Sequence, residues 1–153
     1  MKRKLFLLVA VVLLFAELAA PTAQAARVFS VENEVETVRA GNYLFSKPIR
    51  RLNSLDGIMA STSVYSGSCS GSERHITSVR VFCNVSWGSS PYILEITSPG
   101  GTIVSRWCGT STTSYNFSDF DGEDPRGNWT VSITTRGRVT TMSGSLTVNY
   151  TFQ

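Results

Sequence analysis

The fold class is decided by residues 76–87, which read Ile76-Thr77-Ser78-Val79-Arg80-Val81-Phe82-Cys83-Asn84-Val85-Ser86-Trp87. Apolar residues recur here at every second position, and in an extended chain they share one face: Val79, Val81, Cys83, Val85 and Trp87. The other face carries Arg80, Asn84 and Ser86. A period of two is typical of a half-buried β-strand. The segment therefore predicts a strand with one face in a core.

Shorter runs of the same kind follow along the chain, at 92–97, 102–107, 129–134 and 146–152. Each is rich in β-branched and aromatic residues and is bounded by Gly, Pro, Ser or Asp. Ser98-Pro99-Gly100-Gly101 predicts a hairpin turn between the first two runs, because Pro presets φ and Gly accepts a positive φ. Several short strands at this spacing predict an all-β sandwich or barrel.

The first part of the chain is less regular. Residues 31–38 are compatible with an edge strand or a short helix, and Lys47-Pro48 and Asp56-Gly57 predict turns. Residues 66–72 are a flexible loop by composition, since they contain mostly Ser and Gly.

Residues 1–25 have the three parts of a signal peptide. A basic start, Met1-Lys2-Arg3-Lys4, precedes an apolar run from Leu5 to Phe15 and a small-x-small pattern that ends at Ala25. The apolar run is shorter than the ~20 residues that span a bilayer. The sequence therefore predicts a secreted or periplasmic protein that does not span the membrane.

Charge gives no indication of a nucleic-acid partner. The formal net charge of the whole chain is +3, and three of its basic residues leave with the signal peptide. The remaining basic residues are scattered apart from Arg50-Arg51, so no basic footprint for nucleic acid is present.

Catalysis of the serine-protease type is not expected. The reaction needs a Ser nucleophile, a His base and an orienting Asp. His75 is the one histidine of the chain, it follows Arg74 in a predicted loop, and no Gly-x-Ser-x-Gly motif is present. We therefore predict that the chain is not an enzyme.

Three cysteines follow the signal peptide, namely Cys69, Cys83 and Cys108. An oxidising compartment favours one disulfide among them, and the sequence leaves all three pairings open. The remaining cysteine is either a reactive thiol or, as we favour, a small buried apolar residue. No Cys-x-x-Cys motif is present, which argues against a zinc site.

Four carboxylates crowd one predicted loop: Asp119, Asp121, Glu123 and Asp124. Carboxylate oxygens are the ligands that calcium prefers, so the loop is a candidate calcium site. The spacing is not that of an EF-hand, because Thr130 occupies the position of the closing Glu. Carboxylates in a solvated turn are the alternative.

Five aromatic residues could form a sugar-stacking platform or belong to the core: Trp87, Tyr92, Trp107, Tyr115 and Trp129. Trp87 and Trp129 fall on the apolar faces of their predicted strands, so we expect them in the core. Trp107 lies between Arg106 and Cys108 and is the one we single out as a candidate ligand contact.

The second half of the chain resembles the P domain of subtilisin-like proprotein convertases, also called the P/Homo B domain. The resemblance rests on the long strand 76–85, the hairpin Leu94–Thr102, the segment Phe117–Val131 with Gly127-Asn128-Trp129-Thr130, and the closing strand 144–152. It implies a jelly-roll β-sandwich, akin to galactose-binding domains, over residues 58–153, with 26–57 as an N-terminal segment that could add an edge strand. It also implies an accessory or binding module that lacks the protease, whose partner is a protein, such as a protease, or a surface glycan.

Overall fold

The computed structural model describes residues 40–88 and 90–153. The predicted signal peptide and the segment 31–38 lie outside these residues. Within the described range the chain forms strands and turns, and no helix there is long and apolar enough to cross a membrane.

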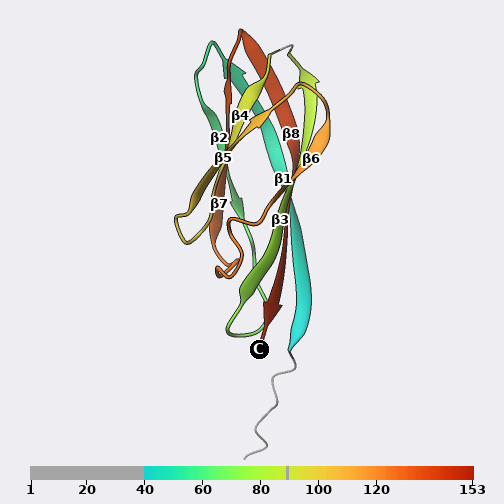
Figure 1. The fold of residues 1–153 in the computed structure, drawn as a ribbon, viewed down its shortest axis with the longest axis vertical. Helices are drawn as coiled ribbons and strands as arrows, with labels where there is room; N and C mark the ends of the chain where they lie inside the picture. The colour runs from blue at the N-terminus through green and yellow to red at the C-terminus, as the bar shows by residue number, and fades with distance from the viewer. Residues whose placement is uncertain (1–39, 89) are drawn as a thin grey trace, which may run out of the picture. The chain divides into compact units, whose positions relative to one another are not determined.

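The described chain is all-β and forms two antiparallel four-stranded sheets that face each other as a β-sandwich (Figure 1). The strand orders are β1-β8-β3-β6 and β2-β7-β4-β5, the arrangement of a jelly roll. The strands are β1 (Gly41–Leu55), β2 (Ala60–Tyr65), β3 (His75–Trp87), β4 (Tyr92–Thr97), β5 (Ile103–Cys108), β6 (Thr113–Phe117), β7 (Asn128–Thr135) and β8 (Val139–Phe152). The predicted fold class is therefore confirmed.

The hairpin predicted around residues 98–101 is also confirmed. Strands β4 and β5 pair in unbroken register from Tyr92 opposite Cys108 to Thr97 opposite Ile103. The Ser98 N–H donates to the Thr102 carbonyl at 2.9 Å, and Gly101 has φ +92°. A positive φ is the reason that glycine is needed there.

Strand β1 differs from the expectation. Lys47-Pro48 was predicted to be a turn, but both residues lie inside β1, where Pro48 pairs with Ser145 of β8. Proline is tolerated because β1 is an edge strand, so one side of its backbone needs no ladder hydrogen bond. Strand β1, which starts at Gly41, is an edge strand of the kind that residues 26–57 could add.

The prediction that Trp87 belongs to the core is wrong. The alternation of β3 holds from Val79 to Val85, but the β3–β8 register shifts between Val85 and Trp87. A β-bulge of this kind turns the following side chains to the other face. Trp87 consequently lies on the outer face of its sheet and is 63% exposed.

The core lies between the inner faces of the two sheets. Trp129 is fully buried there, as predicted, with its ring edge-on to Phe120 at 5.4 Å between centroids. Its indole N–H donates to the Pro125 carbonyl at 3.0 Å. Around it pack mainly aliphatic residues: Val79, Val81, Leu94, Ile96, Val131, Ile133, Leu146 and Val148.

The sandwich has two ends with different connections. We call the end that carries the connections 56–59, 88–91, 109–112 and 136–138 the upper end, which is at the top of Figure 1. The lower end carries 66–74, 98–102 and 118–127. Backbone hydrogen bonds lock the connections at each end, for example Arg136 N–H to the Pro91 carbonyl at 2.9 Å and Ile76 N–H to the Glu123 carbonyl at 2.9 Å.

Candidate functional site

Trp107 lies near the upper end of edge strand β5 and points away from the core. It is 56% exposed, and the guanidinium carbon of Arg136 lies over its ring at 5.5 Å from the centroid. A cation at this distance is attracted by the negative face of the indole, so the two side chains hold each other in place. Ile93 of β4 and Thr134 of β7 continue the row that Trp107 begins across the sheet.

Two hydroxyl-rich rows lie below Trp107 on the same outer face. The first runs Ser105, Glu95, Ser132, Ser61, and the second runs Ile103, Thr97, Thr130, Ser63. Ser105 donates to Glu95 at 3.2 Å, and the hydroxyls of Ser61 and Ser132 lie 2.9 Å apart. We call this surface, with Trp107, Ile93, Thr134 and Arg136 at its upper end, the Trp107 face.

The other aromatic candidates do not join Trp107. Tyr92 and Trp129 are fully buried, and Tyr115 packs half-buried against the core. Trp87 is exposed, but on the outer face of the opposite sheet. A platform built from all five aromatics is therefore not formed, and Trp107 remains as the candidate contact.

Sequence reasoning missed the neighbours of Trp107, although a signal existed for one of them. The turn at 98–101 fixes the β4–β5 register, and counting back from Thr97 opposite Ile103 places Ile93 opposite Trp107. Arg136 arrives from the β7–β8 connection, and no local pattern indicates that contact.

The four carboxylates of the acidic loop have separate surroundings. Arg74 donates to both oxygens of Asp124, from Nε at 3.2 Å and from Nη2 at 3.3 Å. Glu123 accepts a hydrogen bond from the Ser98 hydroxyl, whereas Asp119 and Asp121 are exposed. Among the described residues no three acidic, histidine or cysteine side chains gather where a metal ion could bind. Calcium binding by this loop stays a prediction.

The electrostatics of Asp124 fit a structural role. Partial burial alone would raise the pKa of Asp124, but the hydrogen bonds from Arg74 and from the Arg126 N–H outweigh it and hold that pKa below its ordinary value. Asp124 is thus a charged anchor between the loops 66–74 and 118–127 at neutral pH. Because the pair is partly exposed, its contribution to stability is small.

All three cysteines are free thiols in this structure, so the expected disulfide is not formed in it. Cys83 and Cys108 are buried on facing sheets, whose backbones lie ~10 Å apart in a sandwich. A disulfide needs Cα atoms about 4.4–6.8 Å apart. Cys69 lies in the loop 66–74 at the lower end, beside Tyr150. Burial raises the pKa of the Cys83 thiol to about 11, so this group is neutral and unreactive at neutral pH.

Tyr92 is a buried residue with an unusual polar group. Its side chain is fully buried, and within residues 40–88 and 90–153 its hydroxyl has no hydrogen-bond partner stronger than the neighbouring thiols. Its polar neighbours are the thiols of Cys83 and Cys108 and the hydroxyl of Tyr115. Burial raises the pKa of Tyr92 above its ordinary value, so the hydroxyl stays protonated. A buried hydroxyl without a partner costs folding free energy.

Tyr92→Phe should therefore stabilise the protein, by about 1 kcal/mol, because it removes the unpartnered hydroxyl and keeps the ring. Urea unfolding measures this as a higher midpoint with an unchanged slope. Tyr150→Phe is the matched control, since the Tyr150 hydroxyl accepts from the Ser70 N–H at 3.2 Å and its loss should destabilise. A lower midpoint for Tyr92→Phe would contradict the prediction and indicate a bound partner such as an internal water.

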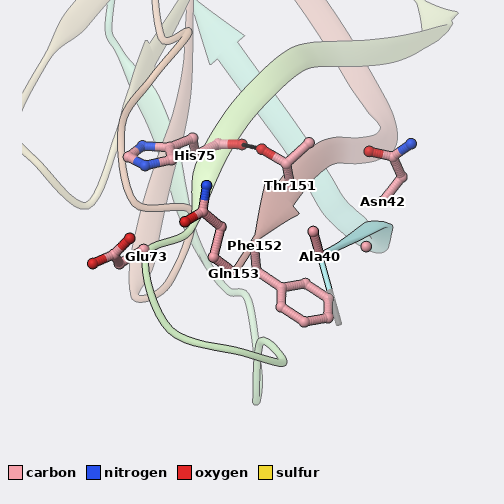
Figure 2. A pocket seen from close by; sticks show the side chains of 8 residues that line it. Ala40, Asn42, Glu73, His75, Thr151, Phe152 and Gln153 are labelled. Carbon is pink, nitrogen blue, oxygen red and sulfur yellow. Dashed lines mark hydrogen bonds between the residues drawn. The ribbon is translucent and has the colours of Figure 1, made fainter. Parts of the chain in front are cut away.

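A shallow pocket of about 420 Å³ lies at the lower end, where β1 begins and β8 ends (Figure 2). His75 Nδ1 donates to the Gly122 carbonyl at 3.1 Å, and its ring is turned away from Phe152 and Asn42. Thr151 Oγ1 donates to the backbone oxygen of His75 at 3.4 Å, so it is not directed at the imidazole. The lining residues are Ala40, Gly41, Asn42, Glu73, His75, Thr151, Phe152 and Gln153. This arrangement contains no nucleophile paired with His75.

No protein-family model matches the chain, and no curated protein matches its sequence. A solved structure of FlhE is similar at a TM-score of 0.51 and 14% identity, over 74% of this chain and 97% of FlhE. Two further similar structures have TM-scores of 0.31 and 0.33. One is a family two carbohydrate esterase from Cellvibrio japonicus, at 12% identity over 72% of this chain and 34% of that chain. The other is the extra small virus particle of the prawn Macrobrachium rosenbergii, at 14% identity over 74% of this chain and 80% of that chain.

None of these three structures is a convertase P domain. At this level of identity the likeness to FlhE concerns the fold alone, and it covers nearly the whole of that chain.

Proposed function

We propose that this chain is an exported, non-catalytic binding module that binds a protein partner through the Trp107 face. The observation that carries the proposal is Trp107 itself, a large aromatic side chain that is 56% exposed on the outer face of a sheet. A contiguous exposed apolar patch rimmed by polar groups marks an interaction site, and Trp107 adjoins the partly exposed Ile93 and the guanidinium of Arg136. The predicted signal peptide supports export, and the resemblance to an accessory domain supports a non-catalytic binding role.

The composition at the upper end of the Trp107 face favours a protein partner. Residues that dominate protein–protein binding energy are most often Trp, Tyr and Arg, and here Trp107 and Arg136 are paired. Ile93 is partly exposed beside them and extends the apolar area. Because the cation–π contact already fixes both side chains, binding loses little side-chain entropy.

A surface glycan is the second candidate, favoured by the two hydroxyl-rich rows beside Trp107. Ser105, Glu95 and Ser61 present donors and acceptors in one line across the sheet, whereas Ser132 between Glu95 and Ser61 is buried. A sugar ring can stack on an indole while its hydroxyls bond to such groups. The two candidates share the surface and differ in the ligand.

Trp107→Ala should abolish capture of the partner. A photo-crosslinking phenylalanine analogue at Thr134, in the same row as Trp107, would be introduced in cells that make and export the protein. We expect one discrete crosslinked protein, at least a tenfold loss of it in Trp107→Ala, and no loss in Trp87→Ala. Trp87 is the matched control because it is exposed to a similar degree, 63% against 56%, on the opposite sheet.

A crosslinked product that survives Trp107→Ala would contradict the proposal, as would the absence of any product. A parallel pull-down on insoluble polysaccharides addresses the second candidate. Binding to a polysaccharide that is lost in Trp107→Ala and kept in Trp87→Ala, without a protein product, would replace the protein partner by a glycan.

A further inference from the structure

Strand β5 has an open edge. It pairs with β4 on one side over all six residues, and it is the last strand of its sheet. Its register with β4 has no bulge, and the strand contains no proline. The edge strand β1, by contrast, carries Pro48 and a register shift between Ile49 and Leu52. These are features that prevent edge-to-edge pairing, and β5 lacks them.

The side chains of β5 do not protect the edge either. Ile103 is 62% exposed and Trp107 56% exposed, and both lie on the outer face with Ser105 between them. Its one charged residue, Arg106, belongs to the other face, where its guanidinium lies over the Phe117 ring at 4.7 Å from the centroid. The outer face of β5 thus presents Ile103, Ser105 and Trp107, none of which is charged.

We propose that two copies of the chain pair antiparallel through β5, around a two-fold axis at Ser105. Residues that face each other across an antiparallel pair must point to the same side of the sheet. With the axis at Ser105, Ile103 lies opposite the partner's Trp107, and Trp107 lies opposite the partner's Ile103. This contact is self-complementary, as a two-fold interface requires. The two four-stranded sheets become one continuous sheet.

Charge complementarity favours a second copy in this orientation. The connections of the upper end carry Arg136 and Arg138 against Asp56, and those of the lower end carry five carboxylates against Arg74 and Arg126. The upper end is therefore net positive and the lower end net negative. Glu123 is tied to Ser98, in the turn that begins β5, and Arg136 lies over Trp107 near the end of β5. Antiparallel pairing sets the Arg136 end of each copy beside the acidic end of the other. Opposite charges across an interface fix its orientation.

The contact is small, because a six-residue strand is only ~20 Å long. Interfaces below the standard size belong to weak, reversible complexes. We therefore expect a dimer in rapid exchange with monomer. Pairing is edge to edge, so the Trp107 face of each copy keeps its outward side exposed, while Trp107 and Ile103 at its margin also contact the second copy. The dimer does not depend on the proposed ligand, and it would present two such faces side by side.

Sedimentation equilibrium of the purified protein, without any ligand, tests the pairing. We expect a mass that rises with concentration towards twice the monomer mass and falls again at high salt, since the end-to-end charges are screened. Ser105→Lys should leave the protein monomeric, because it sets two ammonium groups opposite each other at the axis. The matched control is Ser63→Lys, an equally exposed position on β2, the other edge of the same sheet, which should still dimerise.

Three results would overturn the pairing. They are a monomer at every concentration, a dimer that Ser105→Lys does not weaken, and a loss of dimer in Ser63→Lys as large as that in Ser105→Lys. Thermal melting of both lysine variants shows that they remain folded, so a monomeric Ser105→Lys cannot be attributed to unfolding. If the protein dimerises through β5 but gives no crosslinked partner protein, this inference stands and the proposed function is refuted.

Discussion

Replacing Trp129 by alanine should remove about 3–5 kcal/mol of folding free energy, the range measured for large aromatic residues in cores. Trp129 is fully buried between the sheets, and its ring edge contacts Phe120 at 5.4 Å between centroids. The substitution leaves a cavity there and also removes the donor to the Pro125 carbonyl. That carbonyl belongs to the loop before β7, so the loss reaches the lower end as well.

Thermal melting and urea unfolding measure the loss, and Trp87→Ala is the control. Trp87 is a residue of the same type, but it is 63% exposed, so its replacement should change stability by less than about 0.5 kcal/mol. Because small domains have only about 5–15 kcal/mol to lose, Trp129→Ala could be too unstable to purify. Trp129→Phe keeps most of the ring and should give an intermediate loss. Equal stability of Trp129→Ala and Trp87→Ala would refute the burial of Trp129.

The contrast between these two tryptophans shows what the sequence can predict. Alternation placed both on an apolar face, and Trp129 is indeed in the core. Trp87 follows the same pattern but lies after the register shift between Val85 and Trp87. A bulge adds one residue to one strand only, and no residue type in that segment is required to form it. Periodicity therefore predicted the strand correctly, but it assigned the wrong face to Trp87, which follows the bulge.

Strand β1 was harder to predict for a different reason. Its residues Lys47 and Pro48 are typical of a turn, and Arg50 and Arg51 are charged. The edge position allows them, since one side of an edge strand faces solvent and needs no apolar or hydrogen-bonded neighbour. Edge position follows from the pairing with β8, which joins residues about 100 positions apart in the chain. The residue pattern within β1 does not indicate its pairing with β8.

The candidate site was predictable in part. Trp107 was singled out because it is flanked by Arg106 and Cys108. In the structure Trp107 is exposed on the outer face of its sheet, and Tyr65 is the other exposed aromatic residue on that face. The acidic loop was recognised as a cluster in sequence, but its side chains divide between partners from other loops, Asp124 with Arg74 and Glu123 with Ser98. Sequence proximity of carboxylates does not determine which way each one points.

Gly144→Ala should be as damaging as a large core truncation, with a loss of at least about 3 kcal/mol, at the upper end of what overpacking costs. Gly144 lies in the interior of β8, between Ile49 of β1 and Cys83 of β3. A Cβ at this position would lie 1.8 Å from the Phe82 carbonyl oxygen and 2.9 Å from its carbon. Both are backbone atoms of β3, which cannot retreat without breaking the β3–β8 ladder.

Gly109→Ala is the matched control, because a Cβ at Gly109 meets nothing within 4 Å and the residue has no positive φ. It should change stability by less than about 0.5 kcal/mol. Urea unfolding of the two variants thus separates close backbone approach from the general effect of losing a glycine. Similar midpoints for both would mean that β8 does not approach β3 at Gly144, and the register between these two strands would have to be revised. Since β8 joins β1 to β3, that register also decides which residues of β1 face the core.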